Sequence, residues 1–279
     1  MKFGLIPINV GVTAPEQIIT TVQTAEAAGF ESAWTFEHVM MPVDNKSKYP
    51  YNESGDLGVS PDTPFFDPLI TLAALAAHTT TIRLGTGVNI VAQTNPLLLA
   101  KQVASLDLFC GGRLIFGAGI GWLQQEFDAM GVPFARRGAR FDDYIVAMKK
   151  VWSGDIVEHE SDFLSWHGFK SYPLPAQKAA MPIVIGGNAG KIFQRIAKYG
   201  DGWFIPPSAP TLMREQLVEL RKVCESEGRN YDDIELTSLW DPKGGDDSLK
   251  ELADLGIARA VVMGGGPDMI KLVGDKFIR

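Results

Sequence analysis

The chain alternates short apolar runs, rich in β-branched residues, with longer segments in which apolar side chains recur every three or four positions. The short runs predict buried strands, and the longer period predicts helices that cover them. The predicted strands span 2–8, 32–37, 82–91, 113–119, 182–185, 202–205, 234–239 and 258–263. Helices are predicted over 14–28, 67–78, 95–109, 141–152, 191–199, 212–227, 249–255 and 267–277. Eight strands, each followed by a helix, predict the α/β class and a (β/α)8 TIM barrel.

Two irregular segments interrupt this pattern. The first spans 38–66, after the second strand, and the second spans 153–180, before the fifth. Long loops of this kind in a compact fold are typical of lids over a substrate. The chain has no repeat, low-complexity tract or linker, so we expect residues 1–279 to form one domain. In such a barrel the chemistry belongs at the carboxyl ends of the strands.

Composition narrows the classes of partner. Hydrophobic residues make up 46% of the 279 positions, enough for a sizeable core, and the net charge is −7. That charge gives no bulk attraction to nucleic acid or to an acidic membrane. Two isolated cysteines form neither a disulfide framework nor a zinc set, and no signal peptide or membrane-spanning stretch is predicted. We therefore expect a cytoplasmic protein that acts on a small molecule.

Several catalytic classes lack their motifs. The four histidines show no metal-ligand spacing, so no metal site is predicted. The chain also has no Gly-x-Ser-x-Gly nucleophile motif, and no cysteine pairs recognisably with a histidine. The glycine-rich stretch 117–122 lacks the final glycine of a dinucleotide-binding motif and is weak evidence for a nicotinamide cofactor. Its small residues more simply allow a flat group to lie close to the strand end.

Glycines at two strand ends are candidates for anion binding. Gly186-Gly187-Asn188 lies between a predicted strand and helix, where free backbone N–H groups and the helix dipole favour a phosphate. The alternative is a tight turn that needs only positive φ angles. The glycines at 264–266 have the same form and the same two interpretations.

His38 directly follows Glu37 at the end of the second strand. Catalytic groups of barrel enzymes emerge at this position, although a histidine bonded within its own loop is as good an interpretation of these residues alone. Arg136, Arg137 and Arg140 could grip an anionic tail. The alternative is ion pairing with the nearby acids Glu126, Asp142 and Asp143. We favour ion pairing for Arg136 and leave Arg137 and Arg140 open.

The strand ends together resemble the luciferase-like monooxygenase superfamily and, within it, the coenzyme F420-dependent oxidoreductases. Five blocks carry the resemblance in the right order, and they cover nearly the whole chain. They are SAWTFEH at 32–38, LGTGV at 84–88 with Asn95-Pro96, GRLIFGAGIGWLQQEF at 112–127, GVPF-x-RR at 131–137, and PIVIGG at 182–187 with YGDGW at 199–203. The third and fourth blocks together, at 112–137, are the most specific stretch.

The resemblance implies roles for particular residues. His38 would be the catalytic residue at the reactive edge of the deazaflavin ring. Gly87 and Val88 would form a bulge with a non-prolyl cis peptide that backs one face of the ring. The cofactor-binding set would be Glu37, His38, Gly87, Val88, Trp122, Gln125, Gly186, Gly187 and Asn188, the last three at the phosphate. Trp122 departs from the pattern, since some deazaflavin dehydrogenases have a catalytic Glu there.

The function that the resemblance implies is hydride transfer between C5 of coenzyme F420 and a small organic substrate that the sequence does not identify. Relatives are commonly dimers, so a homodimer is expected. Two alternatives stay open. One is an FMN-dependent monooxygenase of the same superfamily that uses O2, and the other is a non-catalytic flavin or deazaflavin carrier. The long loops argue against a carrier because they look like a substrate lid.

Overall fold

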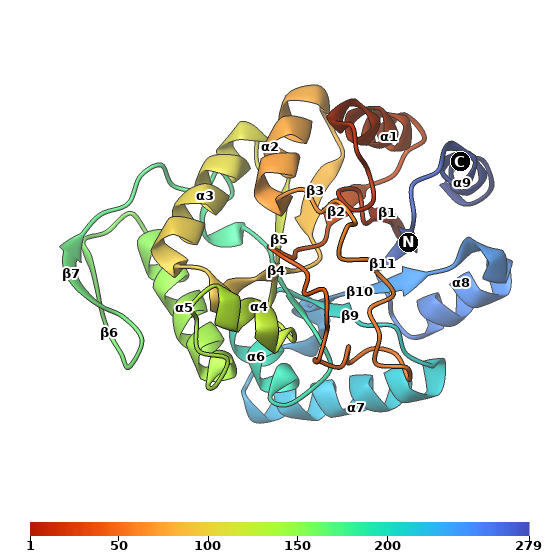
Figure 1. Cartoon of the computed structure of the whole chain (residues 1–279). Helices are drawn as coiled ribbons and strands as arrows, with labels where there is room; N and C mark the ends of the chain where they lie inside the picture. The colour runs from red at the N-terminus through yellow and green to blue at the C-terminus, as the bar shows by residue number, and fades with distance from the viewer. Residues whose placement is uncertain (279) are drawn as a thin grey trace.

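A computed structural model of the chain describes residues 1–278 and confirms the predicted barrel (Figure 1). Its parallel sheet has the order β3-β2-β1-β11-β10-β9-β8-β5-β4, and β3 also pairs with β5, which closes the sheet on itself. The strands are β1 (Lys2–Ile6), β2 (Ser32–Thr35), β3 (Arg83–Thr86), β4 (Asn89–Ile90), β5 (Leu114–Gly119), β8 (Ile183–Gly186), β9 (Gly202–Ile205), β10 (Glu235–Trp240) and β11 (Arg259–Met263).

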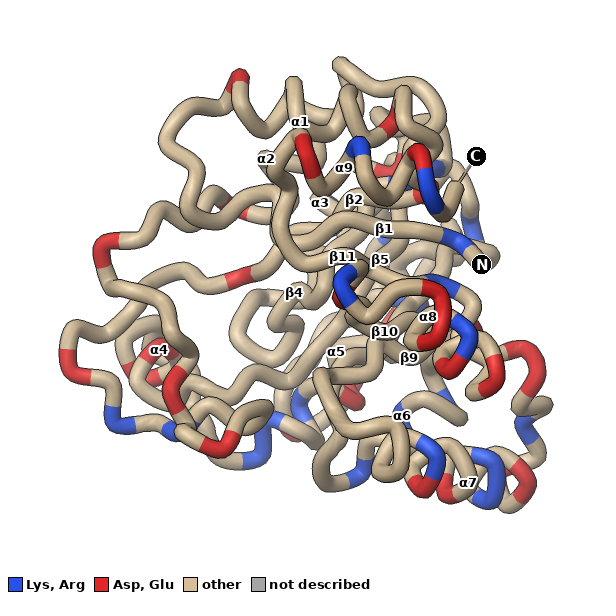
Figure 2. Tube along the Cα trace, turned by 90° about the vertical axis from the view of Figure 1, so that its right-hand side faces the viewer, with Lys and Arg blue, Asp and Glu red and all other residues tan. Residues whose placement is uncertain are grey.

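Helices surround the closed sheet (Figure 1). They are α1 (Pro15–Ala27), α2 (Pro68–His78), α3 (Pro96–Phe109), α4 (Gln124–Ala129), α5 (Arg137–Val151), α6 (Ile192–Tyr199), α7 (Pro210–Ser226), α8 (Gly245–Asp254) and α9 (Pro267–Val273). Five of them begin with proline, whose fixed φ suits the first helical position. The Asp67 and Asn95 side chains cap α2 and α3 by accepting from free backbone N–H groups. Charged residues lie mostly on helices and loops (Figure 2).

The core has two layers. One lies between the sheet and the helices, and the other fills the barrel interior with Ile6, Trp34, Ile115, Val184, Phe204 and Val261. The indole of Trp34 is fully buried and lies against the backbone of Gly85. A Cβ at position 85 would come within 2.4 Å of that ring, so the strand needs glycine there. The filled interior leaves the strand ends as the place for a site.

The amino ends of the strands are closed by Arg259, whose side chain is fully buried. Its guanidinium donates to both carboxylate oxygens of Glu31 at 2.8 and 2.9 Å and to Glu235 at 2.5 Å, and it lies 5.4 Å from the Trp34 ring. Burial acts to raise the pKa of each glutamate, but Arg259 holds both pKa values below their ordinary range. This buried ion-pair cluster therefore seals the end of the barrel opposite the predicted site.

The structure departs from the predicted elements in several places. The strand predicted over 82–91 is divided into β3 and β4 around the Gly87–Val88 peptide, which is cis. Helix α5 begins one turn before the predicted start at 141. The segment 153–180 is not wholly irregular, because β6 (Val157–Glu160) and β7 (Ser165–Phe169) form an antiparallel hairpin that projects from the barrel (Figure 1). Each of these two strands buries only one side chain, so neither has the apolar run from which strands were predicted.

Candidate functional site

His38 follows β2 at the mouth of the barrel and is held by Glu126 of α4. Its Nδ1 lies 3.1 Å from Oε2 of Glu126, and the two side chains are 8% and 0% exposed. Oε1 of Glu126 accepts the backbone N–H groups of Val39 at 2.5 Å and Met40 at 3.3 Å. A carboxylate accepts hydrogen bonds and donates none, so the imidazole nitrogen that faces its second oxygen must carry the hydrogen. The contact therefore favours the Nδ1–H form of His38. Nε2 makes no hydrogen bond within residues 1–278.

A series of aromatic rings extends from His38 across the mouth. His38 meets Phe65 and Trp122 edge to face, with ring centroids 5.6 and 5.8 Å apart. Trp122 meets Tyr49 at 5.2 Å, and Tyr49 meets Tyr51 at 5.3 Å in the same manner. Tyr49, Tyr51 and Phe65 come from the interior of the 38–66 segment. This loop therefore covers the strand ends with apolar surface, as expected of a lid.

Val88 forms part of the floor beneath this loop. It follows the cis Gly87–Val88 peptide, and its methyl groups lie against Gly119 of β5 and Gly186 of β8. A Cβ at either glycine would come within 2.5 or 2.6 Å of a Val88 methyl carbon. Gly186 therefore serves to admit the Val88 side chain, a role that the glycine pair alone did not reveal.

Glu37 binds the strand segment that follows the cis peptide. One carboxylate oxygen accepts from the Asn89 amide at 3.2 Å, and the other accepts the backbone N–H of Ile90. Burial, with smaller contributions from the negative charges of Glu126 and Asp67, raises the pKa of Glu37 to about 8. At neutral pH the carboxyl group is therefore mostly protonated, and it positions the floor of the mouth.

The loop between β8 and α6 consists of residues 187–191. Gly187 has φ +119°, and its carbonyl accepts from the Trp203 indole at 2.8 Å. Within residues 1–278, the backbone N–H groups of 188–191 have no hydrogen-bond partner. Tyr51 of the covering loop lies close above, because a Cβ on Gly187 would be 3.4 Å from its hydroxyl oxygen. Free N–H groups before a helix form a suitable anion site.

Gln125 holds the covering loop rather than pointing a free amide into the mouth. Its oxygen accepts from the Lys46 N–H at 2.7 Å, and its nitrogen donates to the Asp44 carbonyl at 2.8 Å. Its predicted contact to a ring stays a prediction. Together with Glu126, it makes α4 the anchor of the loop at two places.

The arginines after α4 do not form the ion pairs considered from the sequence. Arg136 pairs with Asp162 at 2.6 Å. Arg137 donates to the Gly121 carbonyl at 3.0 Å, and buried Arg140 donates to the Ala92 carbonyl at 2.8 Å. The three acids considered as partners bind elsewhere: Glu126 to His38, Asp142 to Arg195 and Asp143 to His159.

The sequence interpretation missed Glu126 as the partner of His38. The two residues are 88 positions apart, and nothing in their local patterns links them. The available signal was that Glu126 precedes Phe127 in the most specific stretch of the resemblance. Among the residues that the structure describes, no group of three His, Cys, Asp or Glu side chains could hold a metal ion. No described helix is long and apolar enough to cross a membrane.

The raised pKa of Glu37 predicts how stability changes with pH. The unfolded chain loses this proton near pH 4.5, whereas the folded chain keeps it to about pH 8. The wild-type free energy of unfolding should therefore fall as pH rises between these values. Glu37→Gln removes this dependence, so its stability relative to wild type should increase from pH 5 to pH 9 in urea titrations. Exposed Glu53→Gln is the control. A constant difference between Glu37→Gln and wild type would contradict the assignment.

Comparison with known proteins places these features in a family. The family model described as luciferase-like monooxygenase matches residues 4–242. An uncharacterized protein of Mycobacterium tuberculosis is 31% identical over 274 residues, which cover 96% of this chain and 93% of that protein. The 5,10-methylenetetrahydromethanopterin reductase of Methanolobus tindarius is 26% identical over 246 residues, which cover 88% and 67% of the two chains.

Solved structures show the same fold. An F420-dependent secondary alcohol dehydrogenase in complex with an F420-acetone adduct has a TM-score of 0.79 at 15% identity, and the match covers 99% of this chain and 98% of that one. The monooxygenase RslO1 of Streptomyces bottropensis has a TM-score of 0.74 at 21% identity, with 100% and 99% covered. The matched model, the relatives and the shared barrel show that this chain belongs to the luciferase-like monooxygenase family.

Proposed function

We propose that the protein is an F420-dependent oxidoreductase that transfers a hydride between the deazaflavin C5 and a small organic substrate. The observation that carries the proposal is the His38–Glu126 pair at the end of β2, which leaves Nε2 of His38 without a protein partner. The name of the F420-dependent secondary alcohol dehydrogenase supports F420, and the reductase from Methanolobus tindarius supports an oxidoreductase. The similarity to the monooxygenase RslO1 supports a monooxygenase as the second candidate, for which FMN is the cofactor that we propose.

The residues of the mouth fit such a cofactor. The unpartnered N–H groups of 188–191 suit its phosphate, with Gly187 allowing close approach. Val88 presents an apolar surface between β5 and β8, against which a flat ring can lie. Eight of the nine residues expected to bind the cofactor belong to the carboxyl-end loops or to the strand ends that adjoin them, and Gln125 lies in the short helix α4 that follows β5.

When bound, the deazaflavin would supply a two-electron hydride acceptor or donor. The protein's own task is then to move the substrate proton and to exclude water. His38 with Nδ1–H held by Glu126 has Nε2 as a base for a substrate hydroxyl or amine proton, and the protonated imidazole can return it in the reverse direction. The carboxylate of Glu126 stabilises the positive charge that His38 gains. The aromatic rings of the 38–66 loop limit water at the same place.

The cofactor assignment is tested by titrating the purified protein with F420 and with FMN and following fluorescence quenching. We expect F420 to bind more tightly. Anaerobic screening with reduced and oxidised F420 should then identify substrates that change the redox state of the bound cofactor. Tighter FMN binding together with substrate-dependent O2 consumption would establish the monooxygenase instead. Binding without turnover for every donor and acceptor would support a carrier.

The role of Glu126 can be separated from that of the cofactor site. In Glu126→Gln an amide NH2 competes for the position of the oxygen that faces Nδ1, so the Nδ1–H form of His38 loses its acceptor. We expect kcat to fall about 10–100-fold, the usual effect of removing a partner that orients a reactive group. The Kd for F420 should stay within about threefold. Exposed Glu158→Gln, which faces His167 in the hairpin, is the control. Wild-type kcat in Glu126→Gln would show that the pair is only structural.

The phosphate site predicts a loss of affinity in Gly187→Val. The side chain would obstruct the loop, and we expect the F420 Kd to rise at least about tenfold, equivalent to 1.4 kcal/mol. Because φ is +119°, the variant also acquires backbone strain. Gly256→Val is a matched control, since Gly256 has φ +82° and lies in the turn after α8, away from the mouth. Unchanged affinity in folded Gly187→Val would remove this loop from the site.

We also propose that residues 1–279 act as one domain and that two copies form a homodimer. The outward face of α2 carries Ile70, Ala73, Ala74 and Ala77, and exposed Leu98 and Phe109 lie at the two ends of adjacent α3. A helix that is apolar on all sides is usually buried. Sedimentation of wild type and of Ile70→Lys tests this, because the lysine should convert a dimer to monomers.

A further inference from the structure

Asn9 is a fully buried residue just beyond the carboxyl end of β1. Its Nδ2 donates to two backbone carbonyls, that of Phe36 at 2.9 Å and that of Phe66 at 2.6 Å. Its Oδ1 accepts the backbone N–H of Phe36 at 2.9 Å, and its own carbonyl accepts the N–H of Phe66 at 3.0 Å. One residue therefore holds together two backbone segments that are far apart in the sequence.

These two segments are the feet of the covering loop, residues 38–66. Phe36 lies two positions before His38, and Phe66 is the last residue of the loop. The long excursion of the loop therefore starts and ends at the same side chain. The orientation of the Asn9 amide follows from its partners, because the reverse orientation would place an oxygen against two carbonyl oxygens.

The returning foot makes further contacts with the chain that follows β1. Val10 and Phe65 form an antiparallel bridge, and the N–H of Gly11 donates to the Pro64 carbonyl at 2.9 Å. The same foot carries the ring of Phe65, which lies against His38 with ring centroids 5.6 Å apart. His38 is therefore placed from two directions, by the outgoing foot that precedes it and by the ring on the returning foot.

The feet differ from the attachments of the loop to α4. Glu126 and Gln125 bind the loop within residues 39–46, which lie beyond His38. Asn9 instead binds the loop where it joins the barrel. Loss of the α4 contacts would let 39–46 move, whereas loss of the Asn9 contacts would release the base of the loop, and His38 with it.

We propose that Asn9 is a positioning residue of the candidate site, because its amide fixes both feet of the covering loop and thereby places His38. The inference rests on the proposed function, in which His38 moves the substrate proton. A displacement of about 1 Å at the reacting groups can cost about 100-fold in rate. The chemistry of the contact requires asparagine, since Asp has the same shape without the donors and Leu has neither donor nor acceptor.

The first measurement is the rate of Asn9→Leu. We expect kcat for F420-dependent turnover to fall about 10–100-fold, because His38 is no longer held in place. The Kd for F420 should stay within about threefold, since the proposed phosphate loop at 187–191 belongs to a different strand end. A role in folding alone would reduce the amount of folded protein and leave the rate per bound cofactor unchanged.

The second measurement needs neither cofactor nor substrate. Trypsin cleaves after lysine, and Lys46 and Lys48 are exposed residues of the covering loop. Under conditions in which the protein stays folded, release of the feet in Asn9→Leu should raise the rate of cleavage at these two sites about tenfold. Asn9→Ser keeps one polar atom and should show both effects at reduced size, so it tests the proposal even if Asn9→Leu does not fold.

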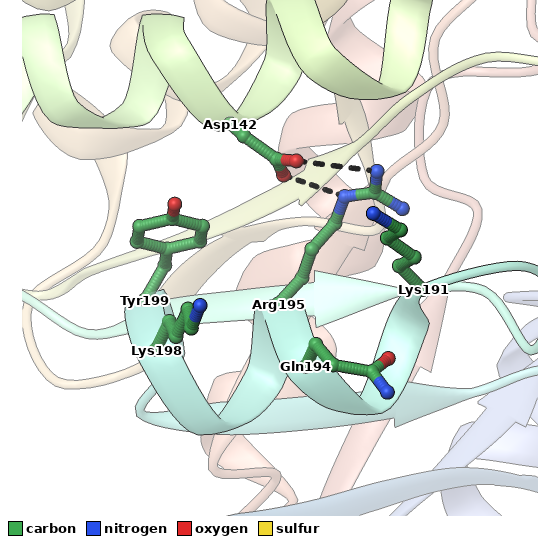
Figure 3. Close-up of a pocket in the computed structure, with 6 residues that line it drawn as sticks. All are labelled: Asp142, Lys191, Gln194, Arg195, Lys198 and Tyr199. Carbon is green, nitrogen blue, oxygen red and sulfur yellow. Dashed lines mark hydrogen bonds and ion pairs between the residues drawn. The ribbon is translucent and has the colours of Figure 1, made fainter. Parts of the chain in front are cut away.

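Two controls separate release of the loop from a general loss of stability. Thr237→Val removes a buried hydrogen bond of 3.1 Å to Arg259 at the opposite end of the barrel. Asp142→Ala breaks the pair with Arg195 that joins α5 to α6 at 2.6 and 3.4 Å (Figure 3). Both variants should unfold at a lower urea concentration than wild type and keep the wild-type rate of cleavage in the loop. Thr237→Val should also keep the wild-type kcat.

Wild-type kcat in folded Asn9→Leu or Asn9→Ser would overturn the proposal, even if the loop were cleaved faster. Cleavage no faster than in the two controls would overturn it as well. These outcomes leave the proposed function intact if the wild type binds F420 and turns it over. Failure of the wild type to bind F420 would instead reject the proposed function, and the cleavage rates would still test whether Asn9 holds the loop.

Discussion

His38→Ala should bind F420 within a few-fold of wild type and lose most of its hydride-transfer rate. The expected decrease in kcat is about 10²–10⁴-fold, the usual contribution of a positioned proton-transfer group. Affinity should survive because the proposed phosphate loop at 187–191 belongs to a different strand end. The measurement is a single-turnover rate with a substrate found by screening, together with the Kd from fluorescence titration.

Two comparisons make this result specific. His167→Ala removes an exposed histidine of the hairpin and should leave both quantities unchanged. His38→Gln keeps a polar side chain but cannot cycle a proton near neutral pH, so it should remain slow. Wild-type turnover in His38→Ala would show that His38 is only a residue bonded within its loop. The proton-transfer group would then have to be sought near Trp122.

Arg259→Leu should lower the free energy of unfolding by about 3–5 kcal/mol, because removing one partner of a buried ion-pair cluster leaves the other charges uncompensated. Glu31 and Glu235 remain 25% and 29% exposed, which favours the lower end of that range. Urea unfolding at neutral pH measures the loss. Lys250→Ala, which breaks an exposed pair with Asp254, should cost less than about 0.5 kcal/mol.

The same variant has a predicted dependence on pH. Arg259 lowers the folded-state pKa values of Glu31 and Glu235, so its stabilising effect is present above their unfolded pKa and is lost as pH falls through the folded values. The difference between wild type and Arg259→Leu should therefore narrow in acid. A difference that is the same at pH 3 and pH 7 would mean that lost packing, and not charge, causes the destabilisation.

The sequence predicts the barrel well because its strands are nearly continuous apolar runs and five of its helices begin at Pro, two of them after a capping Asp or Asn. These are local signals, and the structure follows them. The hairpin of β6 and β7 was missed because its strands bury only His159 and Trp166 and so lack the expected pattern. The cis peptide at Gly87–Val88 was expected from the resemblance alone.

The site was predicted less completely, because the residues that contact one another there are far apart in the sequence. His38, Trp122 and the glycine loop could be placed at strand ends from the order of the elements. The partners that hold them come from far away in sequence, as Glu126 does for His38 and Val88 does for Gly186. Arg136 illustrates the same point, because the acid it binds is 26 residues away on the hairpin rather than among the nearby acids.

The short helix α4 makes access and reactivity interdependent. One carboxylate, that of Glu126, accepts both the imidazole N–H of His38 and the backbone N–H groups of Val39 and Met40 in the covering loop. If residues 39–40 swing outward, this carboxylate loses two of its three donors and can turn away from His38. The open form of the enzyme would thus admit a ligand while its base is misaligned, and alignment would return only on closing. Hydride transfer from a reduced cofactor to an unintended acceptor would then be slow while the loop is open.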